Sequence, residues 1–189
     1  MEKRRLWKEL QKHWPADRLV FLDESCAKTN MTRLRGRAHK GERLHDHAPG
    51  GRWHTTTMLG SLRLNGQIAC MVIQGAADSI VFREYVRQIL APTLQAGDIV
   101  ICDNLGAHYD QAAAKIIQDC GAQLIFLPAY SPDLNPIEAM WAKVKEYLRS
   151  AKARTQTRLL AAIGKALSQV SASDAQGFFR HAGYVCTII

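Results

Sequence analysis

The chain has 189 residues, a formal net charge of +8, 47% hydrophobic residues and 22% charged residues. This length suits one domain with a single core, and the composition excludes a disordered or collagen-like chain. No apolar run reaches the roughly 18 residues that a membrane span needs, and the amino terminus lacks the apolar stretch of a signal peptide. The five cysteines are widely spaced and form no C-x-x-C pair, which argues against a disulfide framework or a zinc knuckle. We therefore expect a cytoplasmic protein without a membrane partner, and the basic balance favours a polyanionic ligand.

The apolar pattern predicts strands and helices in a mixed order along the chain. Residues 1–17 predict a short lead-in helix that ends at Pro15, and residues 18–23 read as a buried strand that closes with an acid. Residues 24–52 are polar and basic, with glycines that would allow a hairpin, so they predict a long insertion. The next predicted elements are strands over 54–62 and 67–74 around Asn65-Gly66, a helix over 79–94, a strand over 98–103, a helix over 111–120, a strand over 123–127, a helix from 136 and a helix over 156–170.

Three acids stand at positions that such a fold could bring together. Asp23 and Asp103 each close an apolar strand, and Glu138 lies in the first turn of a helix that follows a stiff, proline-rich connection. Hard divalent ions such as magnesium bind through a few carboxylates together with phosphate oxygens. In two-metal sites the ions lie about 3.5–4 Å apart, so one carboxylate shared between them is expected. The pattern predicts metal-dependent phosphoryl chemistry.

Structural alternatives remain open for these acids when each is taken alone. Glu138 lies three residues after Asn135, which is the spacing of a reciprocal helix-capping arrangement. An acid that closes a buried strand is often only the first polar residue of a loop. Glu24 follows Asp23, but side chains alternate along a strand, so we expect Glu24 to point away from Asp23.

Two basic blocks flank an acidic middle. Residues 28–52 carry seven basic groups against two acidic ones, and residues 143–158 carry six against one, whereas residues 53–142 have an excess of acids. A solvated, unevenly charged surface would account for this, but basic blocks beside an acidic metal site would also draw in a DNA backbone. The histidines of the insertion are spaced like solvated loop residues and indicate no transition-metal site. The predicted DNA contacts are Lys28, Arg33, Arg35, Arg37, Lys40, Arg43, Arg52, Lys143, Lys145 and Arg149.

Three stretches carry a resemblance to a known family. They are FLDES at 21–25, ICDNLGAH at 101–108 and LPAYSPDLNPIEAMW at 127–141. These resemble the catalytic motifs of the mariner superfamily of DDE transposases, specifically its bacterial insertion-sequence branch. Asp103 and Glu138 are separated by 34 residues, which is the interval characteristic of that family. The basic insertion and residues 91–98 also resemble this branch, so the likeness covers nearly the whole chain.

The resemblance implies an α/β, ribonuclease-H-like fold with a central mixed five-stranded sheet flanked by helices, formed by residues 18–189. It implies that Asp23, Asp103 and Glu138 bind two Mg²⁺ or Mn²⁺ ions and catalyse DNA cleavage and strand transfer of an insertion sequence. Asn104 and His108 match the second motif and would support the site by orienting water or DNA, although a structural role for both stays open.

The resemblance also implies partners. These are the DNA of the element ends, a target that usually contains TA, and a second copy of the chain in the active state; the protein would be bacterial and nucleoid-associated when bound to DNA. Members of the family normally begin with helix-turn-helix modules, and nothing before Arg18 is long enough to form one. We expect such modules to be supplied by an upstream segment. Two alternatives stay open: a nuclease of the same fold that cleaves without joining, and a truncated DNA-binding regulatory fragment without activity.

Overall fold

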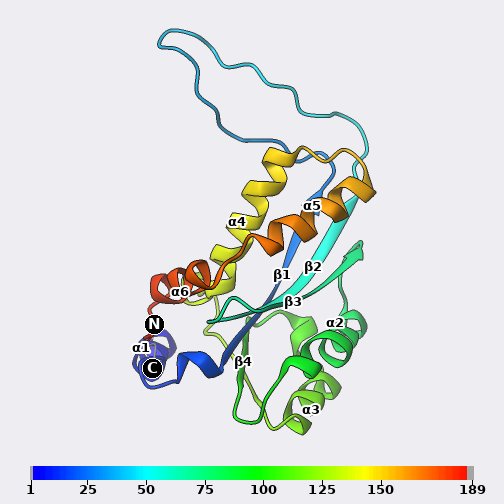
Figure 1. Ribbon diagram of the computed structural model, residues 1–189. Coiled ribbons are helices and arrows are strands. Elements are labelled where there is room, and N and C mark those ends of the chain that lie inside the picture. Colours follow the sequence, from blue (N-terminus) through cyan, green and yellow to red (C-terminus); the bar gives the residue numbers. More distant parts are fainter. Residues whose placement is uncertain (1, 187–189) are drawn as a thin grey trace.

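A mixed five-stranded sheet forms the centre of the computed structural model, which describes residues 2–186 (Figure 1). The order across the sheet is β3-β2-β1-β4-β5, with β2 antiparallel to both of its neighbours and β4 parallel to both of its own. The predicted mixed five-stranded sheet is therefore confirmed. The strands are β1 (Leu19–Lys28), β2 (Thr55–Arg63), β3 (Ile68–Gln74), β4 (Ile99–Cys102) and β5 (Gln123–Phe126).

Helices cover both faces of this sheet. Those labelled α2 and α3 lie on one face, and α4 to α6 lie on the other (Figure 1). Because side chains alternate along a strand, β1 sends Phe21 into the core under α4 and α6 and Leu22 into the core under α2. In residues 2–186 we find no helix with the length and apolar character to cross a membrane. The helices are α1 (Glu2–Leu10), α2 (Ser79–Tyr85), α3 (Gln111–Asp119), α4 (Pro136–Ala151), α5 (Gln156–Ser168) and α6 (Ala172–His181).

The first strand is longer than its apolar run predicts. β1 continues past Asp23 to Lys28, because β2 pairs with it from Val20 opposite Arg63 to Lys28 opposite Thr55. The predicted start of the insertion at residue 24 is therefore wrong. The polar residues after Asp23 are part of β1 because β2 pairs with them, and apolar periodicity does not reveal such pairing. The actual connection, residues 29–54, contains neither strand nor helix, so the hairpin suggested within it does not form.

This connection extends away from the body of the molecule at the end where α4 finishes (Figure 1). Its first residues are held by Arg154, which donates to the carbonyl oxygens of Thr29 (3.1 Å) and Met31 (2.7 Å). From residue 33 to residue 54 every residue is exposed. The segment is thus anchored at its base and open to solvent along its length.

A glycine allows α4 to lie close to the sheet. Gly60 of β2 pairs opposite Asp23 of β1, and a Cβ added to Gly60 would lie 2.8 Å from the Cη2 atom of Trp141. Trp141 belongs to α4 and is 1% exposed. The missing side chain at position 60 therefore sets how near the start of α4 approaches the middle of β1.

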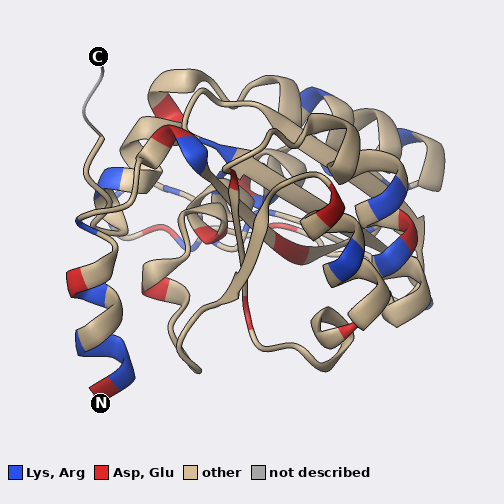
Figure 2. Cartoon of the chain, turned by 90° about the horizontal axis from the view of Figure 1, so that it is seen from below, with Lys and Arg blue, Asp and Glu red and all other residues tan. Residues whose placement is uncertain are grey.

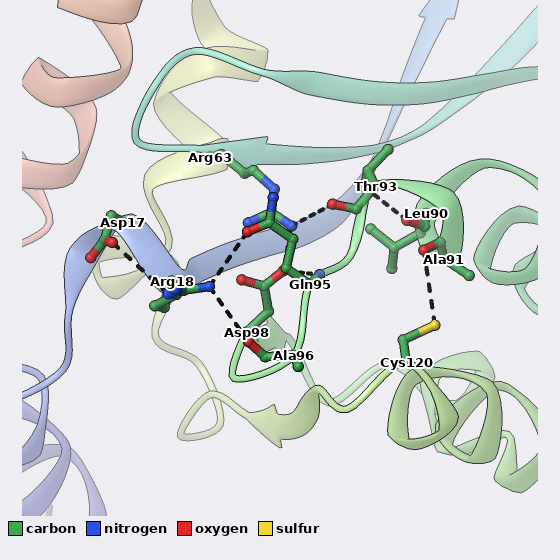
Figure 3. A network of polar contacts seen from close by, with 10 residues as sticks. All are labelled: Asp17, Arg18, Arg63, Leu90, Ala91, Thr93, Gln95, Ala96, Asp98 and Cys120. Atoms are coloured by element: carbon green, nitrogen blue, oxygen red, sulfur yellow. Dashed lines mark hydrogen bonds and ion pairs between the residues drawn. The ribbon is translucent and has the colours of Figure 1, made fainter.

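A buried ion pair braces the edge of the sheet where β4 begins (Figure 3). The Arg63 Nη2 atom lies 2.5 Å from Asp98 Oδ2 and 2.8 Å from the carbonyl oxygen of Thr93, and Asp98 is only 1% exposed. Asp98 also accepts from the backbone N–H of Gln95. Removing one partner of such a pair would leave an uncompensated buried charge, so this acid has a structural role.

Candidate active site

Three different parts of the fold bring Asp23, Asp103 and Glu138 to one cavity of about 390 Å³. Asp23 lies in the middle of β1, two residues beyond Phe21, the last residue that pairs with β4. Asp103 follows the last residue of β4, and Glu138 is the third residue of α4. The pairing between β1 and β4 ends two residues before each aspartate, so both aspartates lie at the same end of these two parallel strands.

The connection before α4 is stiff and aims the start of the helix. It runs from Pro128 through a 3₁₀ turn, Pro132–Leu134, to Pro136 at the first position of α4. The Tyr184 hydroxyl donates to the carbonyl oxygen of Leu134 at 2.9 Å, in the core. The position of Glu138 is therefore decided by packing as well as by the prolines.

Asp23 is the buried acid of this cavity. It is 8% exposed, and its pKa is raised to about 7 by burial first and by the charge of Glu138 second, with a smaller effect from Asp103. The backbone N–H of Glu24 donates to its Oδ1 atom at 2.8 Å. Within residues 2–186 neither Asp23 nor Glu138 forms an ion pair with a basic side chain.

This environment fits a divalent cation by its chemistry. Asp98 is buried like Asp23 but faces the guanidinium of Arg63, whereas the charges of two further carboxylates act on Asp23. Carboxylate oxygens without a cationic side chain are the hard ligands that Mg²⁺ and Mn²⁺ take. In the described part of the chain, no group of three or more His, Cys, Asp or Glu residues forms a preassembled metal site. The acids would have to draw closer around the ions.

His108 contacts Asp103 and is not among the residues that line the cavity. Its ring is buried, with Nδ1 2.8 Å from Asp103 Oδ1 and Nε2 3.8 Å from Glu24 Oε1. Burial alone lowers the pKa of His108, but contacts with Asp103, Cys102 and Glu24 outweigh it and raise the pKa. The His108 contact in turn lowers the pKa of Asp103. Glu24 points to the face opposite Asp23, as expected, but its approach to His108 is a contact that sequence reasoning missed.

Asn104 ties two loops together. Its Nδ2 atom donates to the carbonyl oxygen of Leu127, and its Oδ1 atom accepts from the Tyr109 hydroxyl at 2.6 Å. Asn104 lines the cavity, but both ends of its amide are occupied. It therefore fixes the loop after β4 against the end of β5.

Asn135 is a site residue that sequence reasoning assigned only to the helix cap. α4 begins after Asn135, yet the Asn135 side chain makes no capping hydrogen bond. Its Nδ2 atom instead lies 3.5 Å from Asp23 Oδ2, and its Oδ1 atom is buried without a partner. The reciprocal capping alternative for Glu138 requires a capping hydrogen bond with the Asn135 side chain, and this bond is missing. The exposed Glu138 side chain lines the cavity instead. An Asn before a Pro is an ordinary helix start, so no sequence signal distinguished this orientation.

The predicted DNA-contacting residues fall into different settings. All seven basic residues from Lys28 to Arg52 are exposed. Lys145 and Arg149 lie seven and eleven residues after Glu138, on one side of α4, and line a hollow of about 330 Å³ together with Lys28. Lys143 is different, because its Nζ atom is 2.5 Å from Asp174 Oδ2 at the start of α6.

The sequence of residues 18–160 matches the model of one protein family, the DDE superfamily endonucleases. The chain belongs to this family. A comparison with curated proteins gave no match. The chain is therefore a DDE endonuclease domain. The family model does not distinguish the bacterial insertion-sequence branch from other branches of the superfamily.

Solved structures share the fold of this DDE endonuclease domain. The Mos1 transposase paired-end complex with left transposon end has a TM-score of 0.75 at 14% identity, covering 95% of this chain and 56% of that chain. The catalytic domain of Mos1 mariner transposase gives 0.66 at 13% identity, covering 96% and 83%. The catalytic core domain of BIV integrase gives 0.51 at 15% identity, covering 80% and 81%. The ribonuclease-H-like fold is thereby confirmed, and the chain spans just over half the length of Mos1 transposase.

Proposed function

We propose that this domain is the catalytic domain of an insertion-sequence transposase of the bacterial mariner branch, which cleaves DNA and transfers the cut strand to a target. The observation that carries the proposal is Asp23, a buried carboxylate that shares its cavity with Asp103 and Glu138 and has no basic partner in the described chain. Mos1 structures that contain a transposon end, Mn or Mg support the same chemistry.

Each acid would have a distinct role in holding two Mg²⁺ or Mn²⁺ ions. Asp23 is the buried acid of the three, and the charges of both others raise its pKa, so it suits the shared ligand. Asp103 has one oxygen engaged by His108 and by the backbone N–H of Leu105, so its other oxygen is free for the cavity. Glu138 is exposed at the first turn of α4 and has room to move inward. When bound, the ions would activate the attacking oxygen and stabilise the leaving one.

The DNA path would run from this cavity along α4. Glu138, Lys145 and Arg149 share one side of the helix, and the two cations lie about 10 Å and about 16 Å along its axis from Glu138. Lys28 borders the same hollow, and the exposed residues 33–54 of the connection continue the basic surface beyond it (Figure 1). Basic residues placed in this order would neutralise successive phosphates of a strand that enters the acidic cavity.

The proposal also includes specific binding partners. They are the DNA of the element ends, a target that contains TA, a second copy of the chain in the active state, and an upstream helix-turn-helix segment that would read the terminal repeats. Because phosphate contacts position a protein and base contacts specify the sequence, we expect this chain alone to bind DNA with little sequence preference.

The test uses Glu138→Gln, with Glu146→Gln as a matched control on the same helix. An amide removes charge at the cavity, so the melting temperature in metal-free buffer should stay unchanged or rise. The stabilisation by Mn²⁺, about 2.7 kcal/mol at a concentration one hundred times the dissociation constant, should disappear. Metal-dependent nicking of plasmid DNA should disappear with it, while Glu146→Gln keeps both.

Retention of the metal-induced stabilisation and of nicking in Glu138→Gln would contradict the proposal. Joined products beside nicked ones support a transposase, and nicking without joining would assign the domain to the nuclease alternative. Metal binding without either product would assign it to the regulatory alternative.

A further inference from the structure

The cavity that contains the acids has a second, apolar side that the proposed chemistry does not use. Leu105, Leu127, Pro128 and Ala129 form it, and Tyr130 stands at its edge. Tyr130 is 99% exposed and Leu105 is 45% exposed. An acidic side suited to cations thus adjoins an apolar and aromatic side suited to a different part of a ligand.

Tyr130 has an unusual backbone conformation. Its φ angle is 55°, in the left-handed region that bulky residues rarely adopt. Such strain persists only where the surroundings impose it, and it is common at ligand-binding sites. Because the Tyr130 ring is fully exposed, no packing in the core compensates for this backbone strain.

Contacts from α1 hold this loop. The Arg4 Nη1 atom lies 3.4 Å from the carbonyl oxygen of Tyr130, and the Arg4 guanidinium forms two hydrogen bonds with Asp133, of 2.9 and 2.7 Å. Ser131 Oγ donates to the carbonyl oxygen of Ala129 at 3.2 Å. In Figure 2, α1 beside the N label shows its basic residues between two acidic ones. The loop is therefore fixed with the Tyr130 ring directed outward.

We propose, on the basis of the proposed function, that this apolar side binds an unpaired nucleobase of the DNA strand whose phosphate lies at the acids, with the Tyr130 ring stacked on it. A base within a duplex has both of its faces covered by its neighbours, so an exposed ring can stack only on a base that has left the helix. Stacking accepts any base, because every base has a π-face. The apolar lining would not attract a phosphate, and the acids would repel one unless cations were bound.

The experiment measures binding of a single-stranded hexanucleotide that contains 2-aminopurine, in Ca²⁺, by fluorescence. A second hexanucleotide is abasic at the same position, and its binding is measured by competition with the fluorescent probe. Tyr130→Ala should bind the base-containing probe about 5- to 150-fold more weakly, which is the usual contribution of one stacked base. Tyr130→Phe should bind like wild type, and the abasic probe should bind wild type and Tyr130→Ala equally. Ile80→Ala, which removes an exposed apolar side chain of α2 away from the proposed DNA contacts, should leave the signal unchanged.

Equal binding of the base-containing probe by wild type and Tyr130→Ala, with both proteins folded by thermal melting, would overturn the inference. If Tyr130→Ala weakened the binding of both probes equally, the inference would be overturned as well, because the role of Tyr130 would then be structural. A self-association that Tyr130→Ala abolishes, with probe binding unchanged, would assign the surface to a second copy of the chain and also overturn it. Since the readout requires no cleavage, a base-dependent signal would support this subsite even if Glu138→Gln kept its nicking and the proposed function failed.

Discussion

Asp23, Asp98 and Asp110 are chemically identical side chains whose neighbours give them different roles. Asp98 and Asp110 each contact an arginine, at 2.5 Å in both cases, whereas Asp23 shares its cavity with two other acids whose charges raise its pKa. A carboxylate paired with a guanidinium stabilises the fold, and one surrounded by other carboxylates has the environment that we propose for a metal ligand. Burial alone therefore does not separate a structural acid from a functional one; the charge of the partner does.

Asp110 provides a prediction on pH dependence. It accepts from Arg83 and from the backbone N–H of Ala113 at the start of α3, and these contacts, the one with Arg83 first, lower its pKa to about 2. Its contribution to stability should therefore be complete above about pH 4 and be lost as the pH falls to about 2, where the folded-state carboxylate takes up its proton. Asp110→Asn keeps the cap but not the charge. We expect it to cost about 1 kcal/mol at pH 5 and progressively less as the pH falls through about 2, measured by urea unfolding. A difference that is constant over this pH range would contradict the prediction.

At the scale of elements, α4 connects the acidic cavity to the core and to the basic surface. Its first turn carries Glu138, Trp141 anchors it against Gly60, and its later turns carry Lys145 and Arg149. A shift of this one helix would thus move a proposed metal ligand and the proposed DNA path together.

The close approach at Gly60 makes the position of α4 testable. Gly60→Ala would place a Cβ against the Trp141 ring, and overpacking of this kind costs about 1–3 kcal/mol. Because α4 must then move away from β1, the metal-induced stabilisation should decrease too. Gly164→Ala is the matched control: it lies within α5 with open space around it, and alanine there should raise stability by about 0.5–1 kcal/mol. Urea unfolding with and without Mn²⁺ measures both effects, and a Gly60→Ala protein as stable as wild type would show that α4 is not held in this way.

The basic side of α4 leads to a second prediction at this scale. If Lys145 and Arg149 each neutralise one phosphate, replacing both with Ala should weaken DNA binding and reduce the salt dependence of log K by about 1.8. Lys143→Ala should leave DNA binding nearly unchanged but lower the melting temperature, because it removes the partner of Asp174. Fluorescence anisotropy over a series of salt concentrations compares the two variants. The reverse pattern, with Lys143 needed for DNA binding, would contradict the proposed path.

At the scale of the whole molecule, acids and bases are separated in space as well as along the chain. The acids of the cavity lie in the middle of β1, directly after β4 and at the start of α4, while the 29–54 connection, exposed from residue 33 on, projects from the end where α4 finishes (Figure 1). A connection of that length without regular structure is usually functional or a linker. Its anchoring by Arg154 and its row of exposed arginines favour a surface that contacts DNA or a second subunit.

Replacing Arg33, Arg35 and Arg37 together with Ala tests this connection. The melting temperature should stay close to that of wild type, because exposed charges contribute little to stability. DNA binding should weaken, with a decrease of up to about 2.7 in the salt slope if all three contact phosphates. Arg180→Ala, an exposed arginine on α6, is the control that should leave binding unchanged. A lower melting temperature with unchanged DNA binding would mark the connection as structural.

Local information in the sequence determined most of the elements and the three acids. Apolar periodicity reports which residues face a core, so the five strands and the helices α1 to α5 were predictable, as was the Asn65-Gly66 turn between β2 and β3. The helix α6 was not predicted. The proline-rich connection before Glu138 restricted the backbone enough to place that residue at a helix start. These features depend on residues close together in the chain, whose preferences hold before any tertiary contact forms.

The tertiary structure decided the features that depend on partners distant in sequence. β2 extended β1 to Lys28, although the residues after Asp23 are too polar for the apolar pattern to mark them. The Asn135 side chain turned to Asp23, 112 residues away, instead of capping its own helix. The Arg4 contacts hold the loop of Tyr130 from across 126 residues. In each case several local conformations are close in energy, so a contact made only in the folded chain selects among them.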